Sequence, residues 1–172
     1  MWTSSLHVTI RGGGQVIMGL WDKVKGAVRT MTGGSAKVTI EVSEITLAQP
    51  FSVRVTAVAE ADVEVSSVYL KFQAIEHAEV RDVDYDYGHG HQRIEYVEGA
   101  YTTYSERFDI APKLKLSEGQ TQSWEAELTL PESANPSFDG HIISHQWTVM
   151  AALDCFGNDP DSGWQIIQVW DN

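Results

Sequence analysis

The sequence predicts an all-β protein built as an antiparallel β-sandwich, and three observations support this prediction. Short segments alternate apolar and polar residues with a period of two, which is typical of strands that bury one face. Turn residues, such as Pro50 and the run Glu60-Ala61-Asp62, separate these segments. The sequence has no alternation of strands with helical patterns, so a dinucleotide-type parallel sheet is excluded. We expect about seven to nine strands in two packed sheets.

The N-terminal region differs in pattern from the rest of the 172-residue chain. Residues 1–17 contain three consecutive glycines, which neither a helix nor a strand favours, whereas Met18 begins a pattern typical of a natural start. We interpret residues 1–17 as a disordered or mis-called extension. Residues 18–34 are interpreted as a helix with a glycine linker, and residues 35–172 as one sandwich domain.

A short amphipathic helix is predicted over residues 19–31, because apolar residues recur there at helical spacing. Lys23, Lys25 and Arg29 lie off the apolar stripe. The stripe is a candidate interaction surface, for docking on the protein's own sheet or on a second copy, or for contact with an anionic membrane surface. We favour docking or self-association, since the helix is short and Gly26 weakens it. The stripe consists of Leu20, Trp21, Val24, Val28 and Met31.

Strands with one apolar face are expected over residues 38–42, 51–55 and 63–72. Two further strand patterns cover residues 124–130 and 147–153, and Pro131 ends the first because it has no N–H to give to a ladder. We expect these two to form one long antiparallel pair whose large apolar residues pack against another sheet.

Residues 76–104 combine aspartates, histidines and tyrosines and predict a hairpin that protrudes from the sandwich, with a turn at Gly88-His89-Gly90. A metal site is an alternative for this hairpin, but Tyr87 and Arg93 occupy positions where a calcium loop requires Gly and Glu. A zinc site would lack third and fourth ligands at diagnostic spacing. We favour an acidic hairpin whose charge prevents edge-to-edge pairing. The weak metal candidates are Asp82, Asp84, Asp86, His89 and His91.

Charge and composition exclude several classes of function. The net charge is −12; residues 1–37 carry +4, so the remainder carries −16. This acidic body argues against nucleic-acid binding. The single cysteine, Cys155, fits a reducing cytoplasm and is interpreted as a small apolar residue at a strand end. Ser144 with His141 and His145 lacks a nucleophile elbow and an oxyanion hole, so we expect no enzyme and no cofactor.

The stretch from Ser117 to Asp154 resembles the arrestin-like domain in the order of its features. A glycine-bearing turn precedes a strand, and a Leu-Pro step, a Pro-x-Phe-x-Gly loop and a strand from an aromatic residue to Leu-Asp follow. These features are Glu118-Gly119, Leu130-Pro131, Pro136-Ser137-Phe138-Asp139-Gly140 and Trp147 through Leu153-Asp154. The resemblance extends more weakly to Lys37 and Trp170, and its motifs are signatures of a fold.

Within this group the chain is similar to the bacterial sporulation-control family. The residues that carry this similarity are Met18-Gly19-Leu20-Trp21, Gly33-Gly34 and Ala36-Lys37-Val38. The resemblance implies a cytoplasmic, non-enzymatic regulator or scaffold that acts through protein contacts. Members usually carry two sandwiches in tandem, whereas this chain has the pattern of one. We match no buried ionic core of the arrestin type, so receptor-type activation is not carried over.

The sequence thus predicts a binding protein whose partner is another protein or a second copy of itself. Contact through an exposed sheet edge, the acidic hairpin or the helix is expected. The main alternative is a ligand-binding module, with a metal ion at the Asp/His hairpin or a carbohydrate on exposed aromatic residues. For that alternative, Trp164 and Trp170 are expected at the surface, and Trp124 and Trp147 in the core.

Overall fold

The computed structural model describes residues 9–10, 31–33, 35–86 and 91–172, and it describes side chains for residues 35–81 and 96–172. Every regular element in these residues is a β-strand, which confirms the all-β class. The predicted helix lies outside the described residues except for Met31. Met31 begins strand β2 and pairs with Val38, so the helical interpretation is wrong at that residue.

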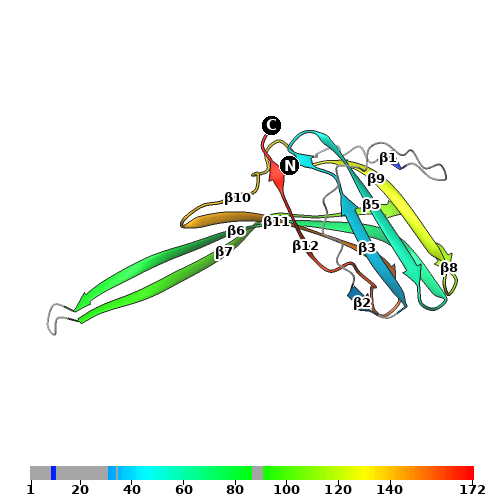
Figure 1. Ribbon diagram of the computed structural model, residues 1–172, viewed down its shortest axis with the longest axis horizontal. Helices are drawn as coiled ribbons and strands as arrows, with labels where there is room; N and C mark the ends of the chain where they lie inside the picture. The colour runs from blue at the N-terminus through cyan, green and yellow to red at the C-terminus, as the bar shows by residue number, and fades with distance from the viewer. Residues whose placement is uncertain (1–8, 11–30, 34, 87–90) are drawn as a thin grey trace, which may run out of the picture.

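Two sheets form the body of the protein (Figure 1). In order, the first contains β1 (Thr9–Ile10), β9 (Thr121–Thr129), β5 (Pro50–Ala59), β3 (Ala36–Val42) and β2 (Met31–Gly33). The second contains β10 (Phe138–Asp139), β11 (Ile143–Cys155), β6 (Val63–Asp86) and β7 (His91–Ala111), with β12 (Gln165–Ile167) beside β11 and β8 (Leu114–Leu116) beside β6. A short parallel pair joins β4 (Ile45–Thr46) to β13 (Val169–Trp170).

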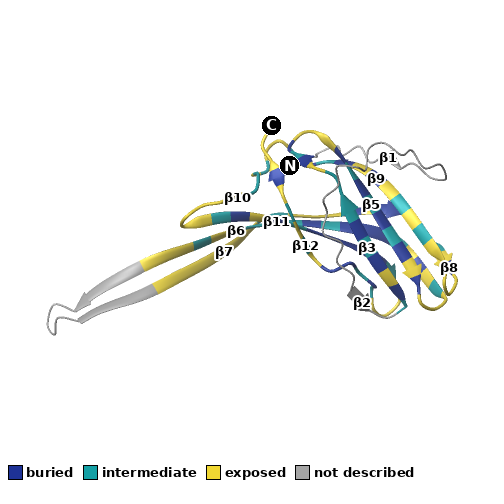
Figure 2. Ribbon diagram, viewed as in Figure 1, coloured by how far each residue is buried: buried dark blue, intermediate teal, exposed yellow. Residues whose placement is uncertain are grey.

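The core lies between the two sheets and follows from the alternation in the sequence. Along β5 every second residue from Phe51 to Ala59 is buried, and the residues between them are more exposed. Phe72 of β6 joins the sheets through edge-to-face contacts with Phe51 and Phe108, each with 5.8 Å between ring centroids. Figure 2 shows the burial concentrated in the body.

The two strands predicted as one pair, residues 124–130 and 147–153, lie in opposite sheets, so that pairing prediction is wrong. β9 pairs with β5, and β11 pairs with β6. The alternation is met equally well by facing strands, because Leu128 and Trp147 bury into the same core from its two sides. The connecting residues cross between the sheets, and Trp147 Nε1 donates to Asn135 O at 2.8 Å within that crossing.

The predicted protruding hairpin is confirmed and is longer than expected. β6 and β7 contain 24 and 21 residues and pair antiparallel from Val68 and Ala111 to Asp86 and His91. At about 3.4 Å per residue β6 spans roughly 80 Å. One half lies in the body and the other projects from it (Figure 1). The sequence pattern alone does not show where the body ends, because β6 continues without interruption.

Candidate functional site

The projecting part of the hairpin begins where the third strand of the sheet stops. β11 accompanies β6 as far as the pair Ile143 and Ala78. Beyond that pair one more hydrogen bond, from Glu79 N to Ile142 O at 2.9 Å, reaches this segment, and then only β7 continues beside β6. We call residues 79–86 and 91–98 the arm. A two-stranded ribbon has no second sheet of its own to cover it, so its side chains are available to other molecules.

A β-bulge at the root of the arm decides which side chains lie on which face. The register shifts between Ala74 and Ile75, so that Thr103 is an extra residue of β7. Before the bulge, Tyr104 lies opposite the buried Ala74; after it, Tyr101 lies opposite Glu76. The core-facing side of β7 therefore passes from even-numbered to odd-numbered residues along the strand.

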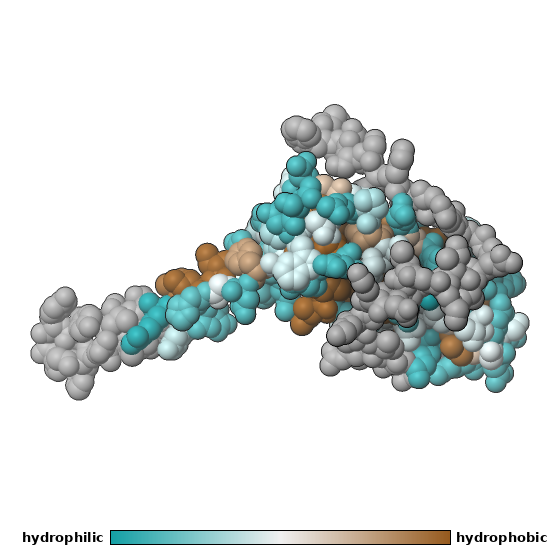
Figure 3. All heavy atoms as spheres, turned by 45° about the horizontal axis from the view of Figure 1, so that its top comes forward, coloured by the Kyte–Doolittle hydropathy of each residue, from teal (hydrophilic) through white to brown (hydrophobic). Residues whose placement is uncertain are grey.

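The bulge gives the arm, near its root, an apolar face that continues the core side of the body, and the next pair on that side is Asp82 with Glu95. Ala78 pairs with Gly99 and Val80 with Val97, and Ile143 of β11 lies beside Ala78. Val80 is 50% exposed, Val97 56% and Tyr101 72%. Figure 3 shows hydrophobic residues gathered where the arm leaves the body. We call Val80, Val97, Tyr101 and Ile143 the apolar face of the arm.

The other face of the arm is mixed: Glu79 and Glu98 form its pair nearest the root, and the next pair is Arg81 with Tyr96, which is 64% exposed. Glu79 lies directly opposite Glu98, and neither residue has a cation opposite it. Two carboxylates in this position destabilise the ribbon unless a cationic group approaches. A hollow of about 390 Å³ lies here, and its lining includes both glutamates with His77, Asp139 and His141. Among the described residues, however, no cluster of three or more side chains is arranged to hold a metal ion.

His145 fixes the root of the arm to the body. Its ring is 2% exposed. Its Nδ1 lies 2.8 Å from Pro136 O, to which it must donate because a carbonyl only accepts, and its Nε2 lies 2.6 Å from Thr103 Oγ1. Thr103 is the bulge residue, and its one hydroxyl proton can go either to Nε2 or to Ala74 O, which lies 3.2 Å from Oγ1. Three segments that are distant in sequence thus meet at one imidazole.

The structure does not pair His145 with Ser144. The ring nitrogens of His145 contact Pro136 O and Thr103 Oγ1, and the residue is only 2% exposed. Ser144 is the preceding residue of the same strand and lies on the opposite face of the sheet from His145. Ser144 and His141 line the hollow beside the arm, and Ser144 and His145 both line a neighbouring hollow of about 480 Å³.

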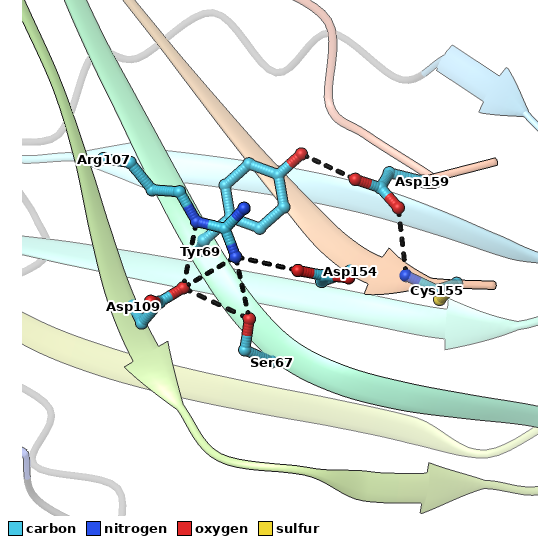
Figure 4. Close-up of polar contacts among 7 residues, drawn as sticks. All are labelled: Ser67, Tyr69, Arg107, Asp109, Asp154, Cys155 and Asp159. Atoms are coloured by element: carbon cyan, nitrogen blue, oxygen red, sulfur yellow. Dashed lines mark hydrogen bonds and ion pairs between the residues drawn. The ribbon is translucent and has the colours of Figure 1, made fainter. Parts of the chain in front are cut away.

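A second polar cluster lies on the outer face of the body (Figure 4). The guanidinium of Arg107 lies 3.8 Å from the ring centroid of Tyr69, and its Nη2 donates to Asp109 and Asp154, each at 2.9 Å. The hydrogen bond to Asp154 contributes most to raising the pKa of Arg107 above its usual range. Ser67 accepts a further bond from Nη2 at 3.0 Å. The two carboxylates and the one guanidinium bond to each other, so the cluster stabilises the sheet and keeps a net charge of only −1.

Tyr69 and Cys155 are joined through Asp159. The Tyr69 hydroxyl donates to Oδ2 of Asp159 at 2.9 Å, and the backbone N–H of Cys155 donates to Oδ1 at 3.0 Å. Burial, followed by the bond to Asp159, raises the pKa of Tyr69 to about 12. Burial, followed by the charges of Asp159 and Asp154, raises the pKa of the Cys155 thiol to about 11. The thiol is therefore a poor nucleophile, and its predicted place at a strand end is confirmed.

The candidate residues of the sequence fall mostly outside what the structure describes. Leu20, Trp21, Val24 and Val28 are not among the described residues. His89 is also outside the described residues, and the side chains of Asp82, Asp84, Asp86 and His91 are not described. The metal site on the hairpin therefore stays a prediction. Trp147 is buried, Trp124 is partly buried, and Trp164 and Trp170 are exposed, as expected.

The apolar face of the arm was missed because residues 76–104 were analysed for charge and metal ligands. A signal was present in the sequence. On the core side of the returning strand, the apolar residues are at odd positions at Val97 and Tyr101 and at an even position at Phe108, although Ile94 and Tyr96 at even positions weaken this signal. A change of parity inside one strand indicates a bulge.

Comparisons with known proteins support the fold. No protein-family model matches the chain, and no curated protein matches it significantly. Among solved structures, the chain is similar to Spo0M, the sporulation control protein from Bacillus subtilis, with a TM-score of 0.54 and 17% identity over 81% of this chain and 51% of that protein. The chain spans about half the length of Spo0M. The distant fold relationship predicted from the sequence is thus confirmed, and at this identity it concerns the fold alone.

Among the described residues, no helix is long and apolar enough to cross a membrane.

Proposed function

We propose that this chain is a non-enzymatic regulatory or scaffold protein that acts through protein contacts made by the arm and its root. The observation that carries the proposal is the apolar face of the arm. Val80 and Val97 are half exposed, because the ribbon that carries them extends beyond the first sheet, which covers β6 and β7 in the body. Apolar side chains in this position are unfavourable in water and are typical of surfaces that another protein covers.

The attachment of the arm supports the same function. His145 and Thr103 hold the root at 2.6 Å, and β11 stiffens β6 as far as Ala78. An anchored ribbon loses less conformational freedom on binding than a free loop, so more of its contact energy becomes affinity. The opposed glutamates Glu79 and Glu98 lie on the reverse face and favour a partner that brings basic residues there.

The likeness to a sporulation control protein adds an expectation about the kind of process. Spo0M is named for a regulatory role, and by analogy of fold we propose regulation for this chain. We also place the protein in the cytoplasm, because its single cysteine suits a reducing compartment. Cell fractionation that recovers the protein outside the cytoplasm would contradict this location.

Shortening the arm tests the proposed function. Ala78 and Gly99 are directly opposite each other, so residues 79–98 can be replaced by Asn-Gly, which closes a two-residue hairpin. None of the residues removed belongs to the core, so the urea midpoint should be unchanged within error. Affinity capture from the native cell extract then compares the full chain with the shortened chain.

The matched controls are two single substitutions of exposed apolar residues by lysine. Val80→Lys changes the apolar face of the arm, and Ile166→Lys changes β12, which is 71% exposed at that residue and pairs with β11 rather than with a strand of the arm. We expect a protein that the full chain and Ile166→Lys retain, and that the shortened chain and Val80→Lys lose. A set of captured proteins that is identical for all four baits would refute the role of the arm.

A further inference from the structure

Strand β7 has one edge bonded to β6, and its other edge has no strand partner among the described residues. An unpaired edge directs a row of backbone N–H and C=O groups outward and is a template for another strand. The free edge extends from the arm through its root into the body, where β7 ends at Ala111. This length is sufficient for several residues of an added strand to pair.

The free edge carries no charge and no proline over residues 99–105, which we call the neutral edge. These residues have the sequence Gly-Ala-Tyr-Thr-Thr-Tyr-Ser. Natural edges are normally protected by lysine, proline, inward-pointing charges or β-bulges, and of these the neutral edge has only a bulge. Only the bulge at Thr103 interrupts this stretch, and charges reappear on either side of it at Glu98 and Glu106.

We propose that a second copy of this chain pairs with the neutral edge, β7 to β7 and antiparallel, about a two-fold axis near Tyr101. The pairing is isologous, so the same residues meet from both copies and the assembly closes as a dimer. The proposal deepens the proposed function, since it rests on the same arm and names one partner for it. A neutral edge is suited to this pairing because identical copies bring no like charges together along it.

The apolar face of the arm supports a second copy over an unrelated strand. That face lies on the core side of the sheet, the side on which Phe108 packs against the first sheet of the body. A two-fold axis perpendicular to the paired strands leaves the first sheets of both copies on that same side. Antiparallel pairing also places the arm of one copy beside the body of the other. The partner's first sheet then covers Val80 and Val97, which have no cover in their own chain.

A stable dimer needs both the β7-to-β7 ladder and the contact over the apolar face of the arm, because of the area that a stable interface buries. A pair of short strands alone buries much less than the about 800 Å² per partner of a stable interface. The apolar face adds to the area of the strand ladder, and Tyr101, which is 72% exposed, contributes to both. At the two-fold axis Tyr101 of one copy meets the same residue of the other, which makes this position the sharpest one to test.

The test measures the mass of the full chain by sedimentation equilibrium. A dimer has twice the 19.1 kDa of the chain. We expect Tyr101→Lys and Tyr101→Glu each to weaken dimerisation by about tenfold or more, because like charges then meet across the axis. Mixing the two variants in equal amounts should restore dimers, since opposite charges then meet. Ile166→Lys, an equally drastic change at an exposed strand residue remote from the neutral edge, should leave dimerisation unchanged.

Salt gives a second, independent readout. Each copy carries −12, so added salt should screen the long-range repulsion and tighten the dimer. Unchanged dimerisation of both Tyr101 variants, or no recovery on mixing them, would overturn the proposal, as would a monomer at all salt and protein concentrations. A monomer whose arm still captures another protein would leave the proposed function standing. If the chain forms dimers but captures no other protein from the extract, the proposed regulation through other proteins is contradicted, whereas the proposed β7-to-β7 pairing stands.

Discussion

Removing the hydroxyl of Thr103 tests whether His145 holds the root of the arm. In Thr103→Val the side chain keeps its size but loses the contact to His145 Nε2 at 2.6 Å and the contact to Ala74 O at 3.2 Å. In His145→Phe an aromatic ring remains, but the contacts to Thr103 and Pro136 are lost. The contact between Thr103 and His145 is common to both changes, so the two effects should not add.

The expected magnitudes follow from counting these contacts. Each hydrogen bond contributes about 1 kcal/mol net, and a buried group left unpaired costs about 1–3 kcal/mol. Each single variant should therefore lose about 2 kcal/mol of unfolding free energy. In the double variant the shared contact is lost only once, so the total loss should be smaller than the sum by about 1 kcal/mol.

Urea unfolding of the four proteins measures this coupling. A matched control combines His145→Phe with Thr39→Val, which removes a hydroxyl bonded to Thr56 O in the other sheet. That pair should be additive within about 0.5 kcal/mol. If the double variant of Thr103 and His145 were as additive as the control, the imidazole would not be what joins the bulge to the body.

Three further outcomes follow from buried groups of the body. Phe72→Ala should cost about 3–5 kcal/mol in urea unfolding, because this fully buried ring contacts Phe51 and Phe108. The thiol of Cys155, with its pKa of about 11, should react with iodoacetamide at pH 8 about tenfold more slowly in the folded protein than in urea. Tyr69 has a folded pKa of about 12 against an ordinary 10.0. Its contribution to stability is therefore complete below about pH 10 and is lost as the pH rises towards 12, and Tyr69→Phe should flatten this decline in unfolding experiments between pH 9 and 12.

The strands and the core were predictable because burial on one face imposes a period of two. Along β5 and β11 the residues predicted as apolar faces are the ones that the structure buries, including Trp147 and Val149. Pairing was less predictable. A period-two strand satisfies its apolar face against a neighbour in a facing sheet as well as it does within a pair, so the alternation could not place residues 124–130 and 147–153 in opposite sheets.

The candidate site was predictable only in outline. Composition indicated a protruding hairpin, but its apolar face depends on where β11 stops, at Ile143, and on the bulge at Thr103. Neither position follows from propensity. β11 begins after a turn in which Gly140 N donates to Ile143 O at 2.9 Å, and the bulge places Thr103 Oγ1 2.6 Å from Nε2 of the buried His145. Both are tertiary constraints that act on strands with otherwise regular patterns.

Deleting Thr103 tests separately whether the bulge sets the register of the arm and whether it sets the direction of the arm. Tyr104 already lies opposite Ala74 and Thr102 opposite Ile75, so a regular ladder without the extra residue keeps both faces of the arm unchanged. The deletion should lower stability by about 2 kcal/mol, as the loss of the hydroxyl does, and should straighten the arm where the bulge bends it. The direction of the arm can be followed by small-angle X-ray scattering.

A disulfide between Val80→Cys and Val97→Cys, in a Cys155→Ser background, reports the register after this deletion. These two positions are directly opposite each other, and a cross-strand pair at such spacing can be bridged. The disulfide should form with and without Thr103, because the deletion removes a residue that has no partner on β6. If the cysteines cross-link only when Thr103 is present, the arm has slipped by one residue, and the apolar face depends on the bulge for its register as well as for its direction.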